Sequence, residues 1–101
     1  MDLFFRILAA ISLVHVLVAC NGPSPGMIGA PGVTVTSGGA PFNVFIRGGI
    51  VEAVRTNFEY PANVRTVFPR ALTAMEEASG CLVREGSMTG DAALIRAKLY
   101  C

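Results

Sequence analysis

The sequence has 101 residues, which is enough for one small domain and excludes a two-domain enzyme. Eight Lys and Arg residues stand against seven Asp and Glu residues. This formal net charge of +1 argues against nucleic acid as a partner, because each neutralised phosphate requires a Lys or an Arg. Apolar residues make up 52% of the chain, but they are concentrated near its start, so the average composition hides two different regions.

Residues 3–19 form an almost continuous apolar segment that only Arg6, Ser12 and His15 interrupt. A helix needs about 20 apolar residues to span a bilayer. This segment is shorter and is followed at once by Asn-Gly-Pro-Ser-Pro, which cannot stay helical. A charged start, an apolar middle and small residues before a cut are typical of an export signal. The sequence therefore predicts a signal peptide over residues 1–19.

The four residues Leu17-Val18-Ala19-Cys20 resemble the lipobox of bacterial lipoproteins, in which Leu, a variable residue and Ala or Gly precede an invariant Cys. The resemblance implies cleavage before Cys20, a diacylglycerol on its thiol and a fatty acyl chain on its new amino group. Two or three such chains hold a small domain stably on a membrane. Asn21 is not the Asp that marks inner-membrane retention in some bacteria, so the resemblance favours the outer membrane, with the protein facing the periplasm. An ordinary secretory signal that ends near a Cys, or an uncleaved anchor, are the alternatives.

Residues 20–41 combine the lipidated Cys with a stretch rich in Gly and Pro that contains no charged residue. Gly raises the entropy cost of ordering and Pro removes backbone donors, so we predict a flexible linker, similar to the spacers of lipoproteins. Residues 33–36 alternate Val and Thr, and this short run is a candidate edge strand if it docks on the domain.

Residues 42–101 are expected to form a small domain. A domain of about 60 residues buries so little surface that it is only marginally stable, so we expect a covalent cross-link to stabilise it. Export would place the chain where disulfides persist. With Cys20 lipidated, Cys81 and Cys101 are the two cysteines left over, so we predict a disulfide between them.

The first element of this domain is a β-hairpin. Residues 42–47 and 50–58 are rich in β-forming residues, and Gly48-Gly49 between them is a two-residue turn signal. The expected pairs are Arg47–Ile50, Ile46–Val51, Phe45–Glu52, Val44–Ala53 and Asn43–Val54. The core face then carries Phe42, Val44, Ile46, Val51 and Ala53. The opposite face carries Asn43, Phe45, Arg47, Glu52 and Val54 and is expected to be wetter.

An amphipathic helix is predicted over residues 63–79. Its apolar positions recur at helical spacing and comprise Val64, Val67, Phe68, Ala71, Leu72, Met75 and Ala78. Asn63 is suited to the N-cap and Gly80 to the left-handed residue after the last turn. Pro69 lies inside the pattern, so we expect a kink there or a helix that starts there.

The last 21 residues predict a second hairpin centred near Gly90-Asp91. Cys81 then falls opposite Cys101 and Val83 opposite Leu99, so the two sulfurs lie across neighbouring strands. A helix that begins at Asp91 is the alternative, because the residues that follow have good helix propensity. The expected fold is α+β: a two-layer ββαββ arrangement with a four-stranded antiparallel sheet and one helix.

Nothing in the sequence predicts catalysis, a cofactor or a metal site. His15 is the only histidine and lies in the segment expected to be removed, so the commonest catalytic base would be missing. Glu76 and Glu77 are adjacent on the predicted helix and point about 100° apart. A hydrolase using Ser87 is the least favoured interpretation, since no base is predicted beside it.

The candidate functional residues form a surface. In the two-hairpin fold, one sheet face mixes cations with aromatic rings, namely Phe45, Arg47, Arg84, Arg96, Lys98 and Tyr100. Such a face suits an envelope protein, an anionic polymer or a lipid headgroup, although cations are also what an ordinary solvated face carries. The sequence predicts a lipid-anchored envelope protein acting as a non-catalytic structural or interaction module. The alternative is a periplasmic inhibitor or immunity-type protein that binds an enzyme through residues 86–91.

Overall fold

The computed structural model describes residues 22–59 and 61–101. The predicted signal peptide over residues 1–19 and the predicted lipidation site Cys20 lie outside the described residues. Within the described ranges, no helix is long and apolar enough to cross a membrane.

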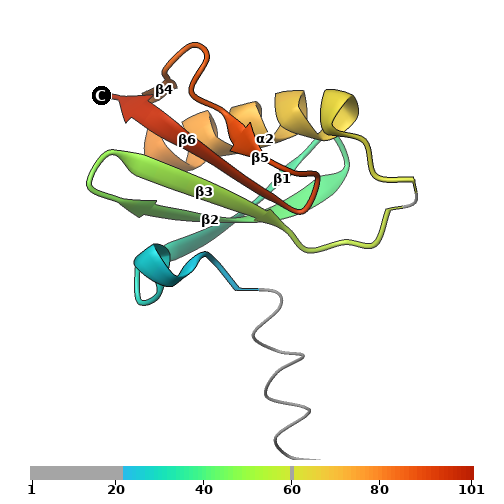
Figure 1. Cartoon of the computed structure of the whole chain (residues 1–101), viewed down its shortest axis with the longest axis horizontal. Helices are drawn as coiled ribbons and strands as arrows, with labels where there is room; N and C mark the ends of the chain where they lie inside the picture. Colours follow the sequence, from blue (N-terminus) through green and yellow to red (C-terminus); the bar gives the residue numbers. More distant parts are fainter. Residues whose placement is uncertain (1–21, 60) are drawn as a thin grey trace, which may run out of the picture.

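The fold is α+β, with one helix packed against a curled antiparallel sheet (Figure 1). Sheet order is β1-β2-β3-β6-β4, and β5 also pairs with β6. The elements in chain order are η1 (Pro25–Met27), β1 (Gly32–Ser37), β2 (Ala40–Arg47), β3 (Ile50–Arg55), α2 (Val64–Ser79), β4 (Leu82–Val83), β5 (Thr89–Gly90) and β6 (Leu94–Tyr100). The prediction of a four-stranded sheet is therefore wrong. β1 adds a strand beside β2, and the strand expected before β6 is divided into β4 and β5.

The hairpin of β2 and β3 is confirmed in its register. Residues 43–47 pair with residues 50–54 as the sequence predicts, and Arg47 faces Ile50 across the turn. Gly48 and Gly49 have φ values of 59° and 78°, the left-handed conformation that a tight two-residue turn requires. Because register decides which side chains share a face, this turn sets both faces of the sheet.

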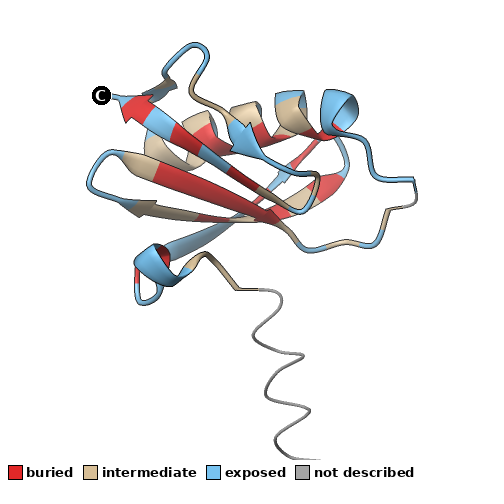
Figure 2. Ribbon diagram, viewed as in Figure 1, coloured by how far each residue is buried: buried red, intermediate tan, exposed pale blue. Residues whose placement is uncertain are grey.

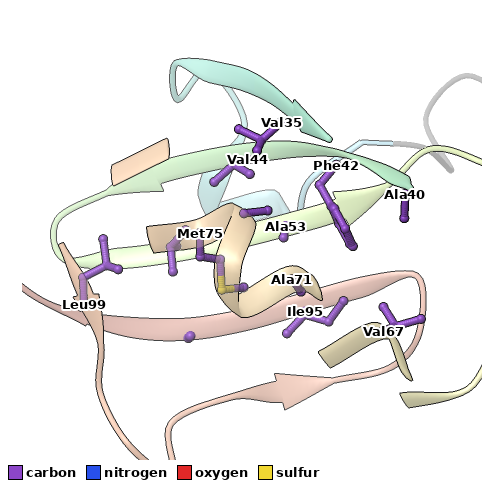
Figure 3. Packing of buried hydrophobic residues seen from close by; sticks show 13 residues of the cluster. Val35, Ala40, Phe42, Val44, Ala53, Val67, Ala71, Met75, Ile95 and Leu99 are labelled. Atoms are coloured by element: carbon purple, nitrogen blue, oxygen red, sulfur yellow. The ribbon is translucent and has the colours of Figure 1, made fainter. Parts of the chain in front are cut away.

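The core lies between the sheet and α2 (Figures 2 and 3). Its sheet side is built from alternate residues of four strands, and its helix side from one stripe of α2. The buried cluster comprises Val35, Ala40, Phe42, Val44, Val51, Ala53, Val67, Ala71, Ala74, Met75, Ile95, Ala97 and Leu99. Ile46 is only half-buried but packs against this cluster. The predicted core face of the first hairpin is thus confirmed.

Helix α2 begins and ends where its capping residues predict. The Asn63 side chain accepts a hydrogen bond from the Arg65 backbone N–H at 2.9 Å, and Gly80 has a φ of 70°. Pro69 lies within the helix, so the expectation of a helix that starts at Pro69 is wrong. The buried stripe includes Ala74, and it leaves the first predicted apolar position, Val64, exposed.

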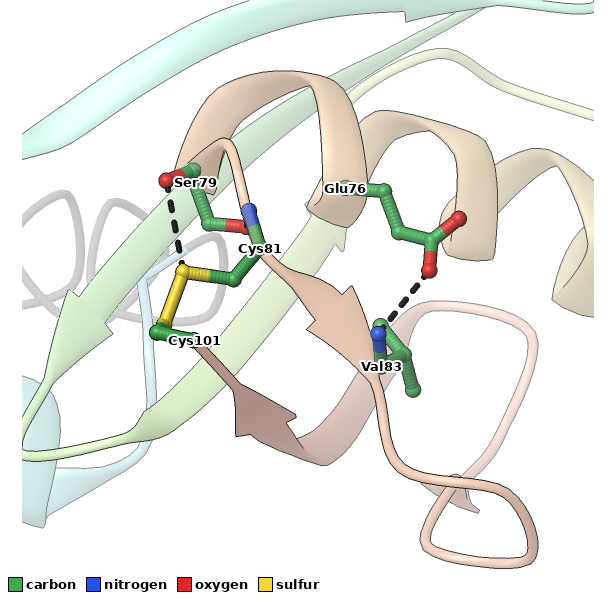
Figure 4. The surroundings of a disulfide bond; sticks show 5 residues. All are labelled: Glu76, Ser79, Cys81, Val83 and Cys101. Atoms are coloured by element: carbon green, nitrogen blue, oxygen red, sulfur yellow. Dashed lines mark hydrogen bonds between the residues drawn. A yellow bond between two sulfur atoms is a disulfide. The ribbon is translucent and has the colours of Figure 1, made fainter.

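The C-terminal segment is a strand, so the alternative of a helix from Asp91 is wrong. Alternate β6 residues Ile95, Ala97 and Leu99 are buried in the core, which a strand allows and a helix would not. Leu82 pairs with Tyr100 and Val83 with Leu99, which brings Cys81 opposite Cys101. The disulfide between these two cysteines is present, with a Cα–Cα separation of 4.7 Å (Figure 4).

Glu76 ties the same region to the helix. Its carboxylate accepts a hydrogen bond from the Val83 backbone N–H at 2.9 Å (Figure 4). The Ser79 hydroxyl accepts one from the Cys81 N–H at 3.1 Å. The disulfide and these two bonds together fix β4 at the edge of the sheet.

The prediction of a flexible linker does not hold for residues 22–41. The Val-Thr alternation forms β1, which pairs with β2 over all six of its residues, so the expected edge strand is confirmed. Before it, residues 22–30 lie on the sheet face opposite α2, where Figure 1 shows η1. We call residues 22–30 the strap. The folded unit therefore extends well before residue 42.

Candidate functional site

The candidate site is the sheet face that points away from α2, which we call the outer face. Alternation along the strands brings cross-strand neighbours into rows on this face. Phe45 of β2 lies beside Glu52 of β3, and Glu52 lies beside Arg96 of β6. In the next row Arg47 pairs with Ile50, and Ile50 pairs with Lys98. All the predicted surface residues of β2 and β6 are thus on one face, but the structure divides them into two groups.

The first group, Phe45 and Arg47, contacts the chain that precedes β2. The Arg47 guanidinium donates to the carbonyl oxygens of Gly26 at 3.0 Å and Ile28 at 3.3 Å. Met27, at the end of η1, is 2% exposed, so the strap also contributes a buried apolar side chain. Arg47 is therefore engaged by the protein's own chain rather than free for a partner.

Phe45 is also occupied by the chain that follows the strap. A Cβ atom added at Gly32 would lie 2.8 Å from the Phe45 ring, so the ring packs directly over the backbone of this glycine. Phe45 is half-buried as a result. The glycine that looks like a linker residue in the sequence is in fact required by an aromatic contact.

Glu52 is the main surprise of the outer face. It was expected on a wet surface, yet its side chain is completely buried, and among the described residues no other charged residue is buried. Its carboxylate accepts hydrogen bonds from the Ser24 N–H at 2.9 Å and from the Ser24 hydroxyl. It also pairs with Arg96 at 3.2 Å. A buried carboxylate is tolerated because donors of this kind replace its hydration.

The second group stays exposed and lies around β6. We call Leu82, Arg84, Arg96, Lys98 and Tyr100 the β6 patch. Leu82 and Tyr100 are a cross-strand pair and are 64% and 66% exposed. The Arg84 guanidinium lies 5.7 Å from the centre of the Tyr100 ring, within the range of a cation–π contact.

A shallow groove of about 540 Å³ borders the β6 patch. Its lining residues are Ile50, Arg84, Glu85, Gly86, Ser87, Thr89, Arg96, Ala97 and Lys98. The groove exists because residues 84–88 bulge out between β4 and β5, opposite only Ala97 and Lys98 of β6. Three cations against one carboxylate make this groove suited to an anionic group.

Ser87, the residue named for a hydrolase, and Asp91 in the same segment both form hydrogen bonds with backbone groups. The Ser87 hydroxyl donates to the Arg84 carbonyl oxygen at 2.7 Å and accepts from the Lys98 N–H at 3.1 Å. The Asp91 carboxylate accepts from the N–H groups of Ala93 at 2.7 Å and Leu94 at 2.9 Å. The Leu94 bond first, and the Ala93 bond second, hold the pKa of Asp91 below its ordinary value of 3.8. Both residues shape the hairpin that carries the groove.

Within residues 22–59 and 61–101, no three His, Cys, Asp or Glu side chains come together in a way that could hold a metal ion. Comparison of the whole chain with protein-family models, with curated proteins and with solved structures gave no match.

Sequence reasoning missed Ser24 and Glu52 as parts of this site. The first hairpin register placed Glu52 on the outer face, but nothing local indicates which distant segment covers it. The one signal in the sequence is the opposite charge of Glu52 and Arg96. It predicts an ion pair between them only if β3 and β6 are already known to be neighbouring strands.

Proposed function

We propose that this protein is a lipid-anchored, non-catalytic interaction module of the bacterial cell envelope. It is attached through Cys20 and faces the periplasm from the outer membrane. The observation that carries the proposal is the use of its three cysteines. Cys81 and Cys101 are joined, which leaves Cys20 at the end of the lipobox-like tetrapeptide. A disulfide also agrees with export, because such bonds persist in oxidising compartments.

The surface offered to a partner is the β6 patch with its groove. We leave Phe45 and Arg47 out of this surface because both contact the chain before β2, although Arg47 itself stays exposed. Arg84, Arg96, Lys98 and Tyr100 remain exposed. The partner chemistry that this surface favours is anionic, since cations line the groove and an aromatic ring flanks it.

The intact mass of the protein extracted from bacterial membranes, with and without reduction, tests the proposal. We expect a chain that starts at Cys20, carries the mass of two or three acyl chains, and gains two thiols only after reduction. A Cys20→Ser variant should remain uncut and unlipidated, which controls for adventitious lipid. An unlipidated wild-type chain with a free Cys20 thiol would overturn the proposal.

The bulge over residues 84–88 favours a second candidate, an inhibitor or immunity-type protein. Five residues leave the sheet at this point, and Glu85 and Gly86 are exposed at the tip. Loops held by a rigid scaffold often carry binding residues. Copurification from envelope extracts separates the candidates: a partner lost with Glu85→Arg but kept with Lys98→Glu would support the inhibitor.

A further inference from the structure

We infer that the β6 patch rests on the anionic headgroup layer of the membrane that carries the anchor. This inference depends on the proposed attachment at Cys20. It names one partner for the patch, a phospholipid surface, and it fixes the orientation of the domain on that surface.

The first argument is the length of the connection between anchor and domain. Ser24 is fixed to the outer face through its bond to Glu52, at 2.9 Å from the backbone N–H. Only four residue steps separate Ser24 from Cys20, and an extended chain covers at most about 3.3–3.6 Å per residue, or about 14 Å here. The predicted linker of about 20 residues would have let the domain turn freely. A connection this short holds the Glu52 region close to the bilayer.

The second argument is that the strap and the β6 patch are joined by one carboxylate. Glu52 accepts from Ser24 on one side and pairs with Arg96 at 3.2 Å on the other. Arg96 also lines the groove. The strap lies opposite α2 (Figure 1), and the patch shares its face. The face held near the bilayer is therefore the one that carries the patch.

The third argument is the distribution of charge over the described residues. The outer face and its groove carry four cations, Arg47, Arg84, Arg96 and Lys98, against two carboxylates, Glu52 and Glu85. The remaining described surface carries three cations, Arg55, Arg65 and Arg70, against four carboxylates, Glu59, Glu76, Glu77 and Asp91. A nearly neutral protein thus presents a positive side and a slightly negative side. The positive side is the one that an anionic lipid surface attracts.

The fourth argument is the chemistry of the exposed apolar residues. Leu82 and Tyr100 are about two-thirds exposed, side by side on the outer face and next to Arg84. Tyrosine is enriched at membrane interfaces because its ring is apolar and its hydroxyl is polar. Arg84, Arg96 and Lys98 around the groove would then meet the headgroup phosphates, for which Arg and Lys are the usual donors.

Lys98 provides a native reporter, because it is the only lysine in the sequence. The lipidated protein, which starts at Cys20, would be placed in detergent micelles, in phosphatidylcholine vesicles, in vesicles containing phosphatidylglycerol, and in native membranes. A membrane-impermeant, amine-reactive acetylating ester would then be added. The rate of acetylation of Lys98 would be measured by mass spectrometry of the peptide that contains it. We expect labelling on phosphatidylglycerol vesicles to be at least fivefold slower than in micelles. Inorganic phosphate added to micelles should give no such protection.

Three variants sharpen this experiment. Thr73→Lys places a second lysine at an exposed position of α2, on the far side of the sheet, and it should be labelled at the same rate in micelles and vesicles. Arg84→Glu should remove the protection of Lys98. Arg65→Glu makes the same charge change at an exposed position on α2 and should leave the protection intact.

The outcomes separate this inference from the proposed function. One outcome is an intact mass that shows acyl chains on Cys20 while Lys98 reacts equally fast in phosphatidylglycerol vesicles and in micelles. In that case the inferred orientation of the domain is wrong, and the proposed lipid attachment at Cys20 is unaffected. If Cys20 carries no lipid, the proposed function itself fails. Equal protection by free phosphate would make the groove a small-anion site. Protection in native membranes alone would indicate a protein partner, and either result would overturn the inference.

Discussion

The two faces of the sheet are closed in different ways. The inner face is closed by α2 through apolar contacts, and its residues follow the alternation of the strands and the stripe of the helix. The outer face is partly closed by the strap through a buried carboxylate, with Ser24 and Arg96 as its hydrogen-bonding partners. The spacing of apolar residues in the sequence predicts how α2 covers the inner face. It does not predict how the strap covers the outer face, because Ser24 lies 28 residues from Glu52 in a segment that looks like a linker.

The comparison predicts the largest loss of stability for the inner face. Phe42→Ala should lower the free energy of unfolding by about 3–5 kcal/mol, because it removes a fully buried ring and leaves a cavity. Urea denaturation would measure the loss. Phe58→Ala is the control, since Phe58 is 92% exposed and its removal should change stability by less than about 0.5 kcal/mol. Equal effects of the two variants would contradict the placement of the core.

The disulfide is expected to rank next. Replacing both Cys81 and Cys101 by Ala should reduce the free energy of unfolding by about 3 kcal/mol, the value expected for a bond closing a sequence separation of 20 residues. The same urea denaturation measures this loss. Reduced wild-type protein is the control and should match the double variant. A double variant as stable as the oxidised protein would show that the disulfide does not stabilise the fold.

The strap should give a smaller effect. Ser24→Ala removes the hydroxyl donor to the buried Glu52 carboxylate and should lower stability by about 1.5 kcal/mol, as for other hydrogen bonds to charged groups. Thr66→Ala removes an exposed hydroxyl on α2 and should have an effect below about 0.5 kcal/mol. If Ser24→Ala behaves like Thr66→Ala in thermal and urea denaturation, the strap does not contribute to the outer face.

The smallest effect is expected from Asp91. Its pKa is lowered in the folded protein, so its contribution to stability is fully present above 3.8 and is lost as the pH falls through the folded value. The contribution is small because the carboxylate is exposed to solvent. The stability difference between wild type and Asp91→Asn, measured from pH 7 to pH 2, should shrink below pH 3.8. A difference that grows on acidification would contradict the two backbone bonds.

Local signals account for most of what the sequence predicts correctly. The register of the first hairpin follows from Gly48-Gly49, and the ends of α2 follow from Asn63 and Gly80. The pairing of Cys81 with Cys101 follows from cysteine use and from the alternation of β6. Each of these depends on the residue types within one element or one turn.

The errors concern contacts between distant segments. Gly and Pro before residue 42 were interpreted as flexibility, yet Pro25 begins η1 and Gly32 is required beneath Phe45. The second hairpin predicts one strand before β6, whereas the structure has two short ones, β4 and β5, on either side of the bulge over residues 84–88. Five of the six predicted surface residues remain exposed, and Phe45 alone is half-buried. Arg47 is exposed but donates to the strap, and no local signal in the sequence predicts this contact.

The central claim is that the strap, residues 22–30, belongs to the fold and covers part of the outer face. Hydrogen–deuterium exchange of the Ser24, Met27 and Ala30 amides in the full chain tests it most directly. Each of the three donates to a described acceptor, at 2.9, 2.9 and 3.0 Å. The account predicts exchange slowed at all three amides relative to an unstructured peptide, and faster exchange at Met27 and Ala30 in the Ser24→Ala variant. Exchange at the rate of an unstructured peptide in the wild type would show a free linker and contradict the account.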